Sequence, residues 1–126
     1  MALNRGNLGN VTVVSANQTT AVLTVGSAQT AYVKGILLHN LSNTEVQNTK
    51  IFVVPNSGGS AGSATTQNQV ARIGLGTADT FFFEPAYPIT LTANGDTIQV
   101  YNVGSGTGGT GSSSKLNCLV LGDVEE

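Results

Sequence analysis

The stretch that best decides the fold is residues 88–103, PITLTANGDTIQVYNV. Apolar and polar side chains alternate in residues 88–92 and again in residues 96–103. This alternation places every second side chain on one face of a β-strand. An Asn-Gly-Asp turn at 94–96 separates the two runs, and Asn and Gly tolerate the positive φ angles that tight turns require. Residues 88–103 therefore predict two strands joined by a turn.

The same composition recurs along the chain. Short runs rich in Val, Ile, Thr, Phe and Tyr favour a pleated, half-buried surface, and polar turns separate them. No window keeps apolar residues at helical spacing without a Gly, a Pro or a β-branched cluster interrupting it. The predicted strands are Val11–Val14, Thr20–Val25, Thr30–Asn40, Thr49–Val54, Val70–Leu75, Thr80–Glu84, Pro88–Thr92, Asp96–Val103 and Ser114–Leu121.

Short strands at roughly 8–12-residue spacing predict an all-β fold, an antiparallel β-sandwich of jelly-roll type with essentially no helix. At 126 residues the chain has the length of one domain. We expect an extended N-terminal arm over residues 1–10, one sandwich domain over 11–122 and an acidic, solvated tail over 123–126. The Gly- and Ser-rich stretches 56–68 and 104–114 contain little apolar area, so we expect two flexible loops.

Three consecutive phenylalanines mark the strand at residues 80–84. Because neighbouring residues of a strand point to opposite faces, Phe81 and Phe83 are assigned to the core and Phe82 to the other face. Leu119 and Leu121 likewise fall on the second face of the last strand. We predict that Phe82, Leu119 and Leu121 form a subunit interface; the alternative is that a loop of the same chain covers Phe82. The predicted core consists of Leu23, Val25, Ile36, Leu38, Ile51, Val53, Phe81, Phe83, Ile98, Val100, Leu116, Cys118 and Val120.

The chain is poor in charge. Asp, Glu, Lys and Arg account for 10% of the residues, against about 25% in a typical soluble domain. Uncharged polar residues take their place, with 16 Thr, 12 Asn, 10 Ser and 6 Gln. A free monomer normally stays soluble by displaying charge. A surface of amides and hydroxyls suits contact with other protein or with water outside a cell, and of the two this composition favours an assembly.

Charge and composition also argue against several partners. The formal net charge is −2 and no run of Lys or Arg occurs, so we expect no nucleic-acid binding, which relies on clustered cations. The longest apolar runs are too short to span a membrane. Cys118 is the single cysteine, which excludes a disulfide within the chain. Residues 1–6 lack the apolar segment of a signal peptide, so we expect synthesis in a cytoplasm.

No motif predicts catalysis, a metal site or a cofactor. Residues 104–109, GSGTGG, fit a dinucleotide-binding pattern, but that pattern requires a helix to begin there, and a strand follows instead. His39 is the single histidine and has no recognisable nucleophile or orienting partner. The carboxylates Asp79 and Glu84 lie at opposite ends of one strand, which does not suit glycoside hydrolysis. We therefore expect a non-enzymatic protein.

From Thr20 to Leu121, the order of segments resembles a group of small β-sandwich virion proteins of tailed bacteriophages. The segments that carry the resemblance are TAYVKGILLHN at 30–40, KIFVVP at 50–55, DTFFFE at 79–84 and LTANGDTIQV at 91–100. The resemblance implies a virion protein without catalytic residues. It implies first a capsid decoration (cement) protein that stabilises the shell by bridging capsomers, and alternatively a tail, neck or fibre component.

Partners follow from that resemblance. A homotrimer would match the threefold positions between capsomers of an icosahedral shell, and the other partner would be the major capsid protein or another virion protein. A second alternative is a carbohydrate-binding module, since such modules are also charge-poor β-sandwiches. They usually present exposed Trp or Tyr to sugar rings, whereas this chain has no Trp and its tyrosines, Tyr32, Tyr87 and Tyr101, are scattered.

Overall fold

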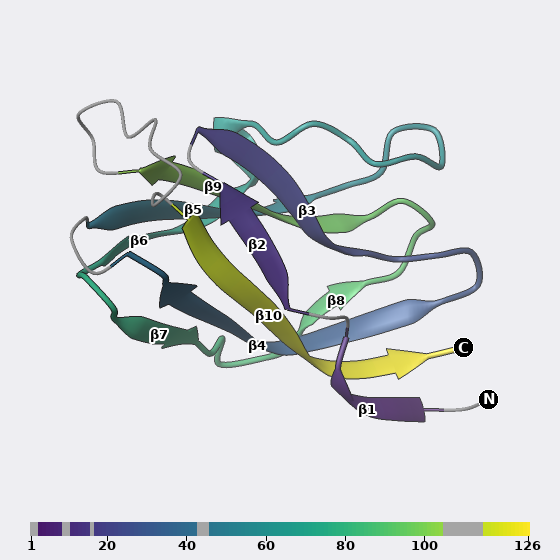
Figure 1. The fold of residues 1–126 in the computed structure, drawn as a ribbon. Helices are drawn as coiled ribbons and strands as arrows, with labels where there is room; N and C mark the ends of the chain where they lie inside the picture. Colours follow the sequence, from purple (N-terminus) through teal and green to yellow (C-terminus); the bar gives the residue numbers. More distant parts are fainter. Residues whose placement is uncertain (1–2, 9–10, 16, 43–45, 105–114) are drawn as a thin grey trace.

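The computed structural model describes residues 3–8, 11–15, 17–42, 46–104 and 115–126, which form two antiparallel sheets stacked face to face (Figure 1). Each predicted strand is present, with ends shifted by one or two residues except at the end of the last strand. One strand, β1, was not predicted, and a single 3₁₀ turn, η1, follows the loop after β5. The elements are β1 Leu3–Asn7, β2 Thr12–Ser15, β3 Gln18–Thr24, β4 Thr30–Asn40, β5 Gln47–Val54, η1 Thr66–Asn68, β6 Gln69–Leu75, β7 Thr80–Phe83, β8 Ile89–Leu91, β9 Thr97–Gly104 and β10 Lys115–Glu125.

Strand order identifies the architecture. In sheet A, β10 and β4 lie at the centre; β1 and β2 pair with one edge of β10, and β7 and β8 with the far edge of β4. Sheet B has the order β3-β9-β5-β6. If β1–β2 and β7–β8 each count as one interrupted strand, the first strand pairs with the last, the second with the seventh, the third with the sixth and the fourth with the fifth. This is the jelly roll, so the predicted fold class is confirmed.

The core lies between the sheets and is built from alternate side chains. Most predicted core residues are fully buried, while Leu23, Val53 and Phe83 pack at its margin. The assignment of Phe81 to the core is wrong, because its side chain is 42% exposed. Phe81 lies opposite Leu38, but β7 is a short edge strand, and the described residues place no strand beyond it to cover the ring. The buried core cluster consists of Val14, Val25, Ala31, Val33, Ile36, Leu38, Ile51, Leu75, Leu91, Ile98, Val100, Leu116, Cys118 and Val120.

The first described strand, β1, lies alongside the end of the last strand, β10 (Figure 1). β2 pairs only with residues 115–118 of β10, so the backbone of the rest of β10 is free to pair with β1, from Leu3↔Glu125 to Asn7↔Leu121. The described part of the expected arm is thus a strand of its own sheet. Residues 123–125 belong to β10; Asp123 is buried and forms an ion pair with Lys34 (Nζ to Oδ2, 2.5 Å). Asp123 is therefore not part of a solvated tail.

The stretch 56–68 differs from the expected flexible loop. It returns across the outer face of sheet B, where the Gly62 carbonyl accepts a hydrogen bond from Gln99 Nε2 (2.9 Å). Asn56 donates its backbone and side-chain N–H groups to Asp96 at 2.9 and 3.1 Å. Phe52 and Val54 point outward from β5 and are nevertheless buried on this side of the sheet. The second expected loop, apart from Gly104, lies outside the described residues.

Candidate interaction surface

The outer face of sheet A presents a row of apolar side chains. Leu119 of β10 lies directly opposite Leu37 of β4, and Leu37 lies opposite Phe82 of β7. The neighbours of Leu37 in β4, Ile36 and Leu38, and those of Leu119 in β10, Cys118 and Val120, point into the core. Strand alternation therefore directs Leu119, Leu37 and Phe82 outward, side by side across three strands.

The small size of Gly35 allows the apolar side chains of this row to form one continuous surface. Gly35 lies beside Leu37 on the outward face of β4 and pairs with Leu121. The Phe82 ring lies over Gly35 so closely that a Cβ atom there would overlap it. Phe82 thus reaches toward Leu121 across a position where any larger residue would block it. We call Leu37, Phe82, Leu119 and Leu121 the sheet A patch.

Polar pairs border the sheet A patch on two sides. Toward one end of the sandwich, His39 Nδ1 and Thr80 Oγ1 form a hydrogen bond of 2.8 Å. Toward the other end, Lys34 forms the ion pair with Asp123. An apolar centre inside a polar rim is the usual anatomy of a protein–protein interface.

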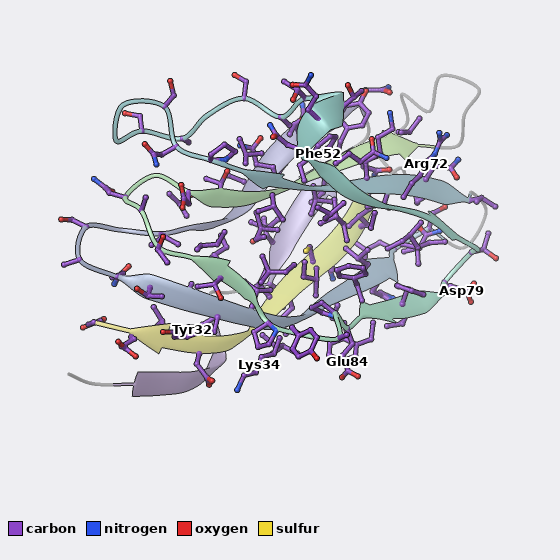
Figure 2. All side chains as sticks on the ribbon, turned by 180° about the vertical axis from the view of Figure 1, so that it is seen from behind. Tyr32, Lys34, Phe52, Arg72, Asp79 and Glu84 are labelled. Atoms are coloured by element: carbon purple, nitrogen blue, oxygen red, sulfur yellow. The ribbon has the colours of Figure 1, made fainter. Side chains whose placement is uncertain are left out.

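A shallow depression adjoins the Lys34 side of the patch. Figure 2 shows Lys34 and Glu84 close together on this side of the molecule. The strand connection after β7 supplies the remaining wall, and Tyr87 in that connection is 84% exposed. The depression is lined by Lys34, Glu84, Pro85, Ala86 and Pro88.

The structure brings together all three residues that the sequence nominated. Phe82 is 44% exposed, so the described residues do not supply the loop cover that was the alternative for its side chain. Leu119 and Leu121 are half-buried beside it. The sequence analysis missed Leu37, although the run Ile36-Leu37-Leu38 carries the same signal of apolar residues on both faces. It also missed Val13 of β2, which faces outward at 49% exposure.

The ionisable groups of the described residues do not gather into a reactive site. They contain no cluster of three or more His, Cys, Asp or Glu side chains that could hold a metal ion. Cys118 lies in the core, and burial raises the pKa of its thiol to about 12, so it is protonated at neutral pH. None of the described helices is long and apolar enough to cross a membrane.

Comparisons with known proteins find likenesses among solved structures. No protein-family model matches the chain. No curated protein matches its sequence. The chain is similar to a chain of a solved structure described as "Structure of infectious bursal disease virus Gt strain", with a TM-score of 0.39 and 11% sequence identity over 98% of this chain. The similar region covers 32% of the viral chain, so this chain spans about a third of it. The assignment of the jelly roll rests on the strand pairing itself.

Proposed function

We propose that this chain is a non-enzymatic structural subunit of a virus particle, a capsid decoration protein that assembles through the sheet A patch. The observation that carries the proposal is the alignment of Leu119, Leu37 and Phe82 on an outward face. The low charge of the chain supports it, because a surface of amides and hydroxyls suits contact with other protein. Jelly rolls build many capsid and lectin domains, but the fold alone does not assign a function.

The size of the patch suits a modest oligomer. Full burial of a Phe or Leu side chain stabilises by roughly 1.5–3 kcal/mol, and Phe82 retains 44% of its exposure for a partner to cover. Association costs about 4–15 kcal/mol in lost translational and rotational freedom. No single side chain of the patch offsets that cost, so the patch must act as a unit, with Val13 extending it.

In this proposal the oligomer is a trimer on the outside of a capsid. A trimer occupies threefold positions between capsomers without leaving contacts unused, and there it bridges copies of the major capsid protein against internal pressure. A tail, neck or fibre position is the alternative within a virion. Mass spectrometry of purified virions separates the two, because hundreds of copies per particle indicate the capsid and a few dozen or fewer indicate the tail or neck.

The direct test compares two phenylalanines of one strand. Phe81 and Phe82 are 42% and 44% exposed but point to opposite faces of β7. Light scattering of the wild type should give a mass about three times that of the 12.8 kDa chain. Phe82→Asp should give a monomer with an unchanged far-UV circular dichroism spectrum, whereas Phe81→Asp should remain oligomeric. A wild type that is monomeric at micromolar concentration and fails to bind emptied capsids would refute the proposal.

A carbohydrate-binding module is the second candidate, and one observation favours it. Tyr87 is 84% exposed beside the depression lined in part by Lys34 and Glu84. Exposed aromatic rings next to hydrogen-bonding groups are suited to binding sugars. A glycan array tests this function: binding that disappears in Tyr87→Ala, and persists in Phe82→Asp, would support it over the decoration role.

A further inference from the structure

Charge is distributed unevenly between the two sheets. The four strands of sheet B, β3, β5, β6 and β9, contain no Asp or Glu. Their only charged residues are Lys50 in β5 and Arg72 in β6. The acidic residues of the described chain lie in sheet A or in connections, at Asp79, Glu84, Asp96, Asp123, Glu125 and Glu126. Sheet B is therefore the positive side of a protein whose formal net charge is −2.

The two cations lie directly opposite each other. Lys50 pairs with Arg72 across the β5–β6 ladder and with Tyr101 across the β5–β9 ladder. Ile51, the next residue of β5, points into the core, so alternation directs Lys50 outward together with its two partners. The Lys50 Nζ atom lies 5.9 Å from the centroid of the Tyr101 ring. We call Tyr101, Lys50 and Arg72 the cation row.

Nothing in the described chain neutralises the cation row. Among the described residues, the ion pair that forms is the one between Lys34 and Asp123, on the other sheet. Like charges directly opposite each other on neighbouring strands destabilise a sheet. An arrangement of this kind, in a chain with five Lys and Arg in total, suits an anionic ligand placed between the two side chains.

The described residues leave this part of the face open. The stretch after β5 covers the neighbouring outward residues, among them Phe52 and Gln99, which are buried. Arg72 is exposed, and Lys50 and Tyr101 are half-buried. Figure 2 shows Arg72 on the side of the molecule opposite to Lys34 and Glu84. The cation row is thus separate from the sheet A patch and faces the other way.

We propose that the cation row is a docking surface for a carboxylate-bearing segment of a partner protein. The Arg72 guanidinium can bind a carboxylate through two parallel hydrogen bonds, and the Lys50 ammonium supplies a second positive charge beside it. Two cations match one or two carboxylates. Two cations are too few for a nucleic-acid-binding surface, because its affinity depends on neutralising several phosphates. The inference does not depend on self-association. In a decoration protein, sheet A would then contact other copies of the chain, and the cation row of sheet B would bind an acidic loop of the particle.

The experiment is a titration with a short Glu-rich peptide, with the same peptide carrying Gln in place of Glu as its control. It uses the full-length Phe82→Asp variant, so that the outcome is independent of the oligomeric state. We expect chemical-shift changes at Lys50, Arg72 and Tyr101, and an affinity that weakens as salt rises from about 50 to about 300 mM. Equal binding of the Gln peptide would overturn the proposal. A single-stranded oligonucleotide that displaces the bound Glu-rich peptide at a lower concentration than free Glu-rich peptide does would also overturn it.

Variants of the cations sharpen the test. Lys50→Gln and Arg72→Gln should each weaken peptide binding roughly tenfold, because each removes a charge-assisted contact. Arg72→Lys should fall between wild type and Arg72→Gln, since it keeps the charge and loses the paired geometry. The matched control is Lys115→Gln, which removes a cation from sheet A and should leave the affinity unchanged. An equal loss in Lys115→Gln would show that only net charge matters and would refute a defined site.

Discussion

Removal of the Asp96 carboxylate should destabilise the fold at the turn between β8 and β9. One carboxylate oxygen, Oδ1, accepts hydrogen bonds from the backbone and side-chain N–H groups of Asn56, and Oδ2 accepts one from the Ala93 backbone at 3.1 Å. Asp96 therefore stabilises its own turn through Ala93, and through Asn56 it also holds the start of the stretch that crosses sheet B. Asp96→Ala removes all three bonds at once.

The magnitude follows from those bonds. A hydrogen bond to a charged group contributes about 1.5–3 kcal/mol, and the three share one half-buried carboxylate, so they do not add fully. We expect Asp96→Ala to lower the free energy of unfolding by roughly 2–4 kcal/mol. For a domain of this size, that corresponds to a drop in Tm of roughly 8–15 °C. Thermal unfolding followed by circular dichroism measures it.

The pH dependence gives an independent check. Burial acts to raise the pKa of Asp96, but the hydrogen bonds that its carboxylate accepts, first those from Asn56, outweigh it and hold the pKa below its ordinary value. Because the folded-state pKa lies below the unfolded-state value of about 3.9, the carboxylate stabilises the fold at neutral pH. That contribution is lost as the pH falls from about 4 through the folded-state pKa. The stability of Asp96→Ala should therefore fall less steeply than that of the wild type over this acid range.

The control is Asp79→Ala, which removes an exposed turn carboxylate whose side chain accepts no hydrogen bond from the described residues. Its Tm should change by no more than about 2 °C, as surface substitutions usually do. The reasoning is refuted if Asp96→Ala behaves like Asp79→Ala, or if the wild type and Asp96→Ala lose stability in parallel as the pH falls.

Three further outcomes can be measured on the same protein. Gly95→Ala should lower stability by roughly 1–3 kcal/mol in urea unfolding, because Gly95 has φ +96° and a Cβ there would lie 2.7 Å from the Ser60 carbonyl oxygen. Gly58→Ala, at φ +61° with open space around it, should be milder. Leu38→Ala should cost about 2–5 kcal/mol by leaving a cavity between the sheets. The Cys118 thiol should resist a thiol reagent at pH 8 and react with one equivalent only after unfolding, because its pKa is about 12.

The strands were predictable because their signal is local. Alternation over 96–103 and the Asn-Gly-Asp turn before it depend only on neighbours in sequence, and both were identified correctly. β1 was not predicted, because its sequence, LNRGN, has no alternating pattern. It becomes a strand only by pairing with the far end of the chain. Pairing between residues more than a hundred positions apart has no local sequence signal.

The candidate surface shows the same division between local and non-local information. Strand parity correctly predicted that Phe82 and Phe81 point to opposite faces. Parity does not tell whether a strand lies at the centre or at the edge of its sheet, and so Phe81 was wrongly assigned to the core. Composition likewise predicted a flexible loop at 56–68. It held no indication that Asp96 and Gln99, some forty residues away, would provide hydrogen-bond partners for that stretch.

The two outer faces of the sandwich meet the same physical problem in different ways. Each sheet has large apolar side chains on its outward side: Phe52 and Val54 on sheet B, and the patch around Phe82 on sheet A. On sheet B the chain covers them itself, because the stretch after β5 folds back and is held there by Asp96 and Gln99. On sheet A the described residues provide no such cover, and Phe82 and Val13 stay exposed within a polar rim. A chain that uses thirteen residues to bury one apolar face, while its described residues leave the other face exposed, fits the subunit proposed above, whose second face another molecule would cover.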